Sequence, residues 1–145
     1  MSYPNSRNAV NHYNQVDTYS AVSGADPHRL VLMLMDGALG KIATARGSME
    51  RHDIPAKGEA IGQAISIIDG LRTSLDLQSG GEIALNLDSL YDYMERRLTE
   101  ANIHNDPSIL EEVAGLLGEI RGAWRAIPRE MRSGSRELRK ASAGA

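Results

Sequence analysis

Cysteine and phenylalanine are absent from this 145-residue sequence, and tryptophan occurs once. Without cysteine the chain can form neither a disulfide nor a Cys-based zinc or redox site, which fits a reducing compartment such as the cytoplasm. Long apolar runs are also missing, because the longest, Leu30–Met35, is far shorter than the roughly 20 residues that a membrane span requires. We therefore expect a cytoplasmic protein without membrane insertion, whose core is filled by Leu, Ile, Ala and Met.

A strong charge of one sign is missing too. The formal net charge is −3, and acidic and basic residues are interspersed along the chain. Such a distribution offers no basic field for the phosphates of nucleic acid, so we expect no nucleic-acid partner. The length favours a single domain that is large enough to bury a core of its own.

Apolar residues recur at helical spacing in four segments, approximately 27–51, 55–76, 82–103 and 107–127. The first and the last begin with an Asp-Pro pair, in which the aspartate caps the helix and the proline occupies its first position. Helices of about 20 residues that are joined by short loops favour antiparallel neighbours. The sequence therefore predicts an all-α fold, an antiparallel up-and-down four-helix bundle over residues 25–128.

Two terminal segments flank the predicted bundle. Residues 1–24 are polar and rich in Asn, but Val10, Tyr13 and Val16 are spaced to share one face of a short helix. We expect an N-terminal arm that docks through these three side chains. Residues 129–145 are basic and rich in Ser, Gly and Ala, a composition that predicts a disordered C-terminal tail.

Catalytic and metal-binding patterns are not found in the sequence. Asp88, Asp92 and Glu95 have helical spacing, but their angles place them opposite the apolar stripe, so we expect a solvated face. No phosphate-binding loop or nucleophile motif is present. No histidine has a partner at metal-site spacing, and they stand isolated at His12, His28, His52 and His104. We expect no enzyme activity, no metal and no cofactor.

The apolar surface exceeds what four amphipathic helices need. Leu30–Met35 is apolar on nearly every side of its helix, and Ile67 widens the apolar face of the second helix. Packing of the bundle and the arm would bury this surplus, whereas a binding groove would use it. Methionine favours a groove, because thioether side chains adapt to varied contacts, and it occurs here at Met33, Met35 and Met94.

The third helix carries part of this surplus. Leu85 and Tyr93 lie outside its apolar stripe, on a face that a simple amphipathic pattern would leave polar. The stripe that we expect in the core consists of Ile83, Leu87, Leu90, Tyr91, Met94, Leu98 and Ala101.

The start of the third helix also carries a family resemblance. Residues 80–94 read Gly-Gly-Glu-Ile-Ala-Leu-Asn-Leu-Asp-Ser-Leu-Tyr-Asp-Tyr-Met, which closely resembles the signature of the FliS family of flagellar export chaperones. Further matches to the family pattern lie at residues 13–16, 26–31, 34–38, 56–58 and 64–68. The chain departs from that pattern at Met35, where the family usually has an aromatic residue, and at Asp26, where it often has Ser.

The resemblance implies a helical bundle that holds the disordered C-terminal segment of flagellin unpolymerised in the cytoplasm until export. It also implies that Tyr13, with Val10 and Val16, acts as a latch over part of the binding groove. An anti-sigma factor and the export gate protein are further partners in the family. We expect the client to contact the apolar surface between the second and third helices and the adjoining first helix, through Met35, Ile67, Leu71, Leu85, Leu87, Leu90, Tyr91, Tyr93 and Met94.

Two alternatives come from other classes of protein. A histidine phosphotransfer module is also a small acidic bundle, but it needs an exposed histidine in mid-helix. His28 is expected at a helix start, and His52 and His104 at helix ends. A homo-oligomeric helical-bundle adaptor would use the surplus apolar surface on copies of itself.

Overall fold

The computed structural model describes residues 26–128, so the expectations for the arm and the tail lie outside the described residues. This part of the chain forms α2 (Pro27–Glu50), α3 (Ile54–Thr73), α4 (Gly81–His104) and α5 (Pro107–Arg125). No strand occurs between residues 26 and 128. The predicted all-α class and its four helices are confirmed. The largest difference in bounds is at α3, which ends at Thr73 instead of Asp76.

Three of the four helices begin with a capping aspartate. Asp26 accepts a hydrogen bond from the backbone N–H of His28 at 2.8 Å, and Asp53 accepts one from Ala56 at 3.2 Å. Asp106 accepts from both the backbone N–H and the hydroxyl of Ser108. Each cap satisfies a donor that the first helical turn leaves unpaired, and such a cap contributes about 0.5–2 kcal/mol.

The fourth start, that of α4, depends on glycine instead. A Cβ on Gly80 would lie 2.5 Å from the Cβ of Ala84 and 2.7 Å from the carbonyl oxygen of Asp76. Gly81 has a φ of +57°, in the left-handed region that glycine adopts without strain. The glycine pair therefore allows the chain to turn tightly from α3 into α4.

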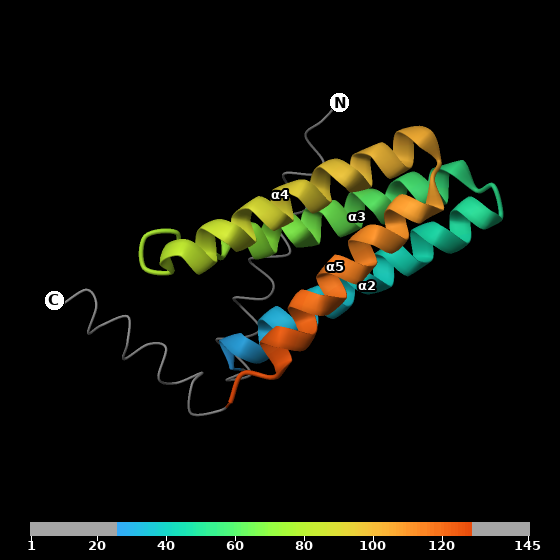
Figure 1. The fold of residues 1–145 in the computed structure, drawn as a ribbon. Helices are drawn as coiled ribbons and strands as arrows, with labels where there is room; N and C mark the ends of the chain where they lie inside the picture. The colour runs from blue at the N-terminus through green and yellow to red at the C-terminus, as the bar shows by residue number, and fades with distance from the viewer. Residues whose placement is uncertain (1–25, 129–145) are drawn as a thin grey trace, which may run out of the picture.

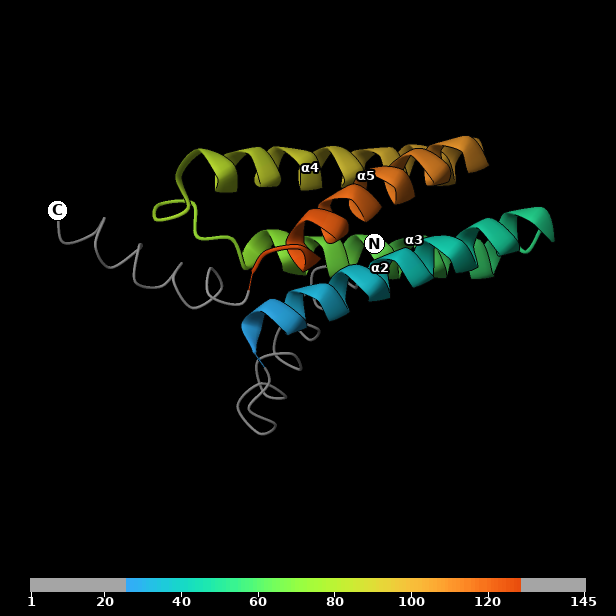
Figure 2. The same ribbon diagram turned by 60° about the horizontal axis from the view of Figure 1, so that its bottom comes forward.

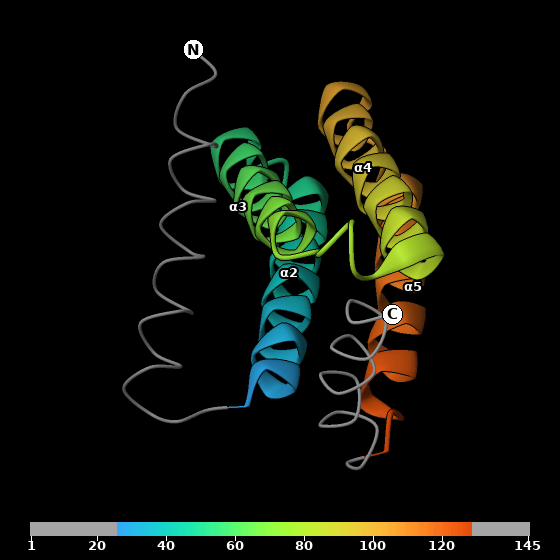
Figure 3. The ribbon, with the colours of Figure 1, turned by 90° about the vertical axis from the view of Figure 1, so that its left-hand side faces the viewer.

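The helices pack in a ring in which each contacts its neighbours in sequence. α2 packs on α3, α3 on α4 and α4 on α5, and α5 closes the ring against α2 (Figures 1 and 3). Since the chain reverses at every loop, the start of α2, the end of α3, the start of α4 and the end of α5 share one end of the bundle. No helix within residues 26–128 is both long and apolar enough to cross a bilayer.

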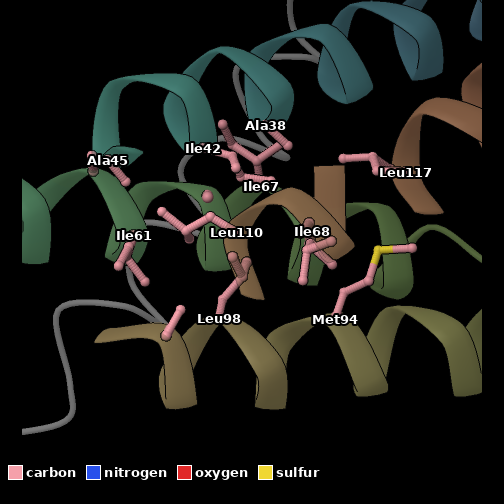
Figure 4. Packing of buried hydrophobic residues seen from close by; sticks show 14 of the residues in the cluster. Ala38, Ile42, Ala45, Ile61, Ile67, Ile68, Met94, Leu98, Leu110 and Leu117 are labelled. Carbon is pink, nitrogen blue, oxygen red and sulfur yellow. The ribbon is translucent and has the colours of Figure 1, made fainter. Parts of the chain in front are cut away.

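The core lies along the axis of the ring (Figure 4). Small, fully buried side chains such as Ala38 and Ala45 allow α2 to approach its neighbours closely. Each large aliphatic side chain that is fully buried contributes about 1.5–3 kcal/mol. The large, fully buried side chains are Met35, Ile61, Ile68, Leu71, Met94, Leu98, Leu110 and Leu117.

The core stripe that was predicted for α4 is only partly correct. Tyr91, Met94, Leu98 and Ala101 are buried as expected. However, Ile83 is 74 % exposed, Leu90 is 36 % exposed and Leu87 is half-buried. These residues lie in the first half of α4, where α5 has moved away from it (Figure 1). Helical spacing identified the correct face of α4 but not the length over which another helix covers that face.

Candidate functional site at the open end of the bundle

α4 and α5 are close at the loop that joins them and diverge toward the start of α4 (Figures 1 and 2). Side chains of α2 hold the far end of α5. The guanidinium of Arg121 forms a salt bridge with the carboxylate of Asp36, and the rings of Trp124 and His28 stack with their centroids 5.3 Å apart. The last turns of α5 therefore follow α2, and the first half of α4 is left partly uncovered.

His28 and Trp124 also exchange hydrogen bonds. His28 Nε2 donates to the carbonyl oxygen of Trp124 at 2.6 Å, and Trp124 Nε1 donates to the carbonyl oxygen of His28 at 3.0 Å. His28 is buried, so it lacks the exposure that a phosphotransfer histidine requires. We call this reciprocal pair the His28–Trp124 clasp.

An exposed apolar surface lies where α4 and α5 diverge. Ile83, Leu87 and Leu90 continue the buried stripe of α4 into this region. On α5, Glu112 bonds to α4 and so marks the side of α5 that faces α4. Leu116 and Ile120 come four and eight residues after Glu112, a spacing that places them on the same side. Both are partly exposed and pack against the core. We refer to these five residues, Ile83, Leu87, Leu90, Leu116 and Ile120, as the open surface.

The structure divides the nine residues that were predicted to contact a client into two groups. The first group is accessible and comprises Leu85, Leu87, Leu90 and Tyr93. The second group is buried between the helices and comprises Met35, Ile67, Leu71, Tyr91 and Met94. Side chains of the second group cannot touch another protein while the bundle stays closed. The latch residues Val10, Tyr13 and Val16 lie outside the described residues.

Ile83, Leu116 and Ile120 belong to the open surface but were not predicted as site residues. Ile83 was assigned to the core because it shares the angle of the buried residues on α4. Its place in the first turn after Gly80-Gly81 was the available signal, since the end of a helix is where a neighbour most readily fails to reach.

Tyr93 contributes a polar contact as well as apolar surface. Its hydroxyl donates to Glu112 Oε2 at 2.6 Å, and Arg97 Nε donates to the other oxygen of that carboxylate at 2.8 Å. These two hydrogen bonds lower the pKa of Glu112, and the bond to Glu112 raises the pKa of Tyr93. Tyr93 thus connects α4 to α5 just where the two helices begin to separate.

Carboxylates border the other side of α4, where it packs on α3. Arg72 of α3 donates from Nε to Asp88 Oδ1 at 2.6 Å and from Nη1 to Asp92 Oδ1 at 3.1 Å, and Glu95 Oε2 lies 3.6 Å from Nη1. The predicted solvated face is therefore wrong for Glu95, whose side chain is only 17 % exposed. α3 lies on that side of α4, which the apolar pattern of α4 alone does not show. We call Arg72 with Asp69, Asp88, Asp92 and Glu95 the acidic seam.

Glu95 is the electrostatically strained member of the acidic seam. Burial is the main cause that raises its pKa to about 7, the charge of Asp69 acts in the same direction, and Arg72 opposes both effects. Its Oε2 is buried and accepts no hydrogen bond. Arg72 serves several carboxylates at once, and its hydrogen bond to Asp88 is the main reason that its own pKa is raised.

A second apolar depression lies between α2 and α5. It has a volume of about 300 Å³ and is bordered by a salt bridge between Arg46 Nη2 and Glu111 Oε1 at 2.5 Å. Its remaining lining residues are Leu39, Ile42, Ala43, Leu110 and Ala114. A volume of this size accommodates one or two side chains of a bound chain. Among residues 26–128, no group of three or more His, Asp or Glu is arranged to hold a metal ion.

Comparisons with known proteins identify the family of this chain. The family model described as "Flagellar protein FliS" matches residues 9–131. The flagellar secretion chaperone FliSB of Pseudomonas aeruginosa is 54 % identical over 119 residues, which are 82 % of this chain and 94 % of that protein. FliS of Salmonella typhimurium is 53 % identical over 116 residues, 79 % of this chain and 86 % of that protein. FliS of Vibrio cholerae is 43 % identical over 124 residues, which are 86 % of this chain and 91 % of that protein.

The matched family is one of chaperones, which is not a class of enzymes. The match extends over most of this chain and most of each relative. This chain is therefore a member of the FliS family of flagellar secretion chaperones.

Proposed function

We propose that this chaperone binds the disordered C-terminal region of flagellin one to one in the cytoplasm and keeps it unpolymerised until export. The observation that carries the proposal is the open surface, a row of apolar side chains that continues the core stripe of α4 into solvent. Ile83 at 74 % exposure is its extreme member. Contiguous exposed apolar side chains of this kind mark protein interaction sites.

The client contacts that we propose start from the accessible residues. Leu87 and Leu90 belong to the open surface, while Leu85 and Tyr93 extend the contact to the adjoining sides of α4. Of the buried residues, Tyr91 and Met94 lie on the same helix and keep the client-facing side chains in place. Val10, Tyr13 and Val16 keep their proposed role as a latch over this surface. The export gate protein and an anti-sigma factor are proposed as further partners.

A disordered client must contact more of the chaperone than the five side chains of the open surface. Coupled folding and binding typically buries about 1,000–3,000 Å² and costs about 2–5 kcal/mol in ordering the client. The open surface supplies one contact region, and the depression between α2 and α5 can supply another. A flagellin segment that reaches both would pass around the end of α5. Apolar burial on this scale produces a markedly negative heat-capacity change on binding.

The test compares two exposed isoleucines of the same helix. Ile83 is 74 % exposed on the open surface, whereas Ile103 is 70 % exposed at the other end of α4. We expect Ile83→Ser to weaken binding of a flagellin C-terminal fragment about tenfold and Ile103→Ser to leave it nearly unchanged. Isothermal titration calorimetry at several temperatures gives the affinity, the stoichiometry and the heat-capacity change.

Three results would count against the proposal. Wild-type protein that binds no fragment at tens of micromolar would exclude flagellin as the client. Equal effects of Ile83→Ser and Ile103→Ser would exclude the open surface as the site. Dimers that form in the absence of flagellin and dissociate in Ile83→Ser, measured by sedimentation, would instead assign the open surface to contact between copies of this chain.

A further inference from the structure

Charge is distributed unevenly between the bundle and the segment that follows it. The whole chain has a formal charge of −3. Residues 129–145 contribute +3 to this total, which leaves −6 on the residues before them. The basic residues of the segment are Arg129, Arg132, Arg136, Arg139 and Lys140, and its acidic residues are Glu130 and Glu137.

Much of the opposite charge lies at the end of the bundle where this segment begins. Five carboxylates occupy the end of α3, the following loop and the first half of α4, at Asp69, Asp76, Glu82, Asp88 and Asp92. Arg72 lies among them and bonds to two of them, Asp88 and Asp92. Arg96 also bonds to Asp92, so two guanidinium groups face five carboxylates and the group keeps a net negative charge. Part of the side chain of Asp88 and of Asp92 remains exposed.

The topology brings the segment to this group of carboxylates. α5 ends at Arg125, at the same end of the bundle as the start of α4 (Figure 1), and the His28–Trp124 clasp fixes that exit point. Residues 129–145 can span at most about 60 Å at roughly 3.5 Å per residue. The first half of α4 is only about 15–20 Å long. The segment is therefore long enough to lie along both the open surface and the acidic seam.

The segment also carries apolar residues at a spacing that matches the open surface. Met131 and Leu138 are seven residues apart, which is the separation of Ile83 and Leu90 on α4. On α4 this separation places Ile83 and Leu90 toward one face, about 10 Å apart along the helix axis. Basic residues stand between and beside them, and the carboxylates Asp88 and Asp92 lie on the other side of α4, toward α3.

We propose that residues 129–145 bind to their own bundle, across the open surface and around the start of α4 to the carboxylates on its other side. The consequence for regulation rests on the function proposed above: the segment competes with flagellin for Ile83, Leu87 and Leu90. Attraction between exposed charges is screened by salt, with a Debye length of about 10 Å at 0.1 M and about 3 Å at 1 M. Binding of the segment therefore weakens as the salt concentration rises.

The docking itself is tested without any client. Because the chain has no cysteine, Ser142→Cys provides a single site for a nitroxide spin label in the full-length protein. We expect paramagnetic broadening of the backbone amides of residues 82–90 and none at residues 51–53, the loop at the opposite end. The broadening should disappear in about 0.5 M NaCl. It should also disappear when Arg136, Arg139 and Lys140 are replaced by Gln.

Broadening that is absent from residues 82–90, or that persists in salt and in the Gln variant, would overturn the proposal. Circular dichroism of the Gln variant should be unchanged in the helical range, which separates lost docking from lost folding.

A second measurement, with a flagellin C-terminal fragment, tests whether residues 129–145 compete with flagellin. The Gln variant should bind the fragment several-fold more tightly than wild type at low salt, and the two should converge as salt releases the wild-type segment. Equal affinities at low salt would overturn the competition even where the spin label shows docking. A fragment that binds neither protein would overturn the function proposed above, and the spin-label result would still decide the docking.

Discussion

At the scale of single residues, the buried carboxyl group of Glu95 makes the stability of this chaperone depend on pH. Its pKa is raised to about 7, above its ordinary value of 4.5, because the folded protein buries it beside Asp69. A carboxyl group with a raised pKa contributes stability below pH 4.5, where it is protonated in both states. That contribution is lost as the pH rises through about 7, because the folded protein must then hold a buried charge.

Replacing Glu95 by Gln should remove this pH dependence. We expect Glu95→Gln to be close to wild type near pH 4.5 and about 1–2 kcal/mol more stable than wild type above pH 7. Urea unfolding of both proteins between pH 4.5 and 8 measures the difference. A difference that stays constant across this range would show that the charge of Glu95 does not control stability.

At the scale of helices, local signals were sufficient for some features and not for others. Asp26-Pro27 and Asp106-Pro107 define the starts of α2 and α5 through contacts within a few residues, so their sequence is enough to predict them. The exposure of Ile83 and Leu90 depends instead on where α5 leaves α4. The burial of Glu95 depends on the position of α3. The apolar spacing of α4 predicts neither the position of α5 nor that of α3.

The His28–Trp124 clasp makes the position of α5 testable. His28→Ala removes the ring that stacks on Trp124 and the donor to its carbonyl oxygen. We expect a loss of about 1–2 kcal/mol in unfolding free energy, and faster amide exchange in the last turns of α5 than in its first. Trp124 is the only tryptophan, so its emission should shift to the red. An unchanged emission would mean that the clasp does not hold the end of α5.

At the scale of the whole molecule, residues 26–128 combine a closed core with one end where α4 is partly exposed, and this arrangement explains why only part of the candidate site followed from the sequence. The family signature at residues 80–94 led to the correct family and the correct class of function. It did not separate Tyr91 and Met94, which are buried, from Leu87 and Leu90, which are accessible. That separation depends on how far apart α4 and α5 lie at each turn, a property of the assembled bundle.

The proposed latch is also tested on the whole molecule. If residues 1–24 cover the client surface part of the time, Tyr13→Ala should raise the apparent affinity for flagellin by the inverse of the uncovered fraction. Titration of the fragment into wild type and Tyr13→Ala under identical salt measures this ratio. Weaker binding by Tyr13→Ala would make Tyr13 a direct contact with the client.

The ring of helices has a consequence for the order in which the chain folds. Between residues 26 and 128, three of its four main packing contacts join helices that follow one another directly, and the fourth, α5 on α2, brings together parts of the chain that are far apart in sequence. Local contacts form fast. Bringing together His28 and Trp124, which are 96 residues apart, costs more conformational entropy because a longer loop must be closed. We therefore expect the α2–α3 hairpin to form while the ribosome still holds the rest of the chain. The chaperone becomes complete only after α5 has been synthesised and has returned to α2.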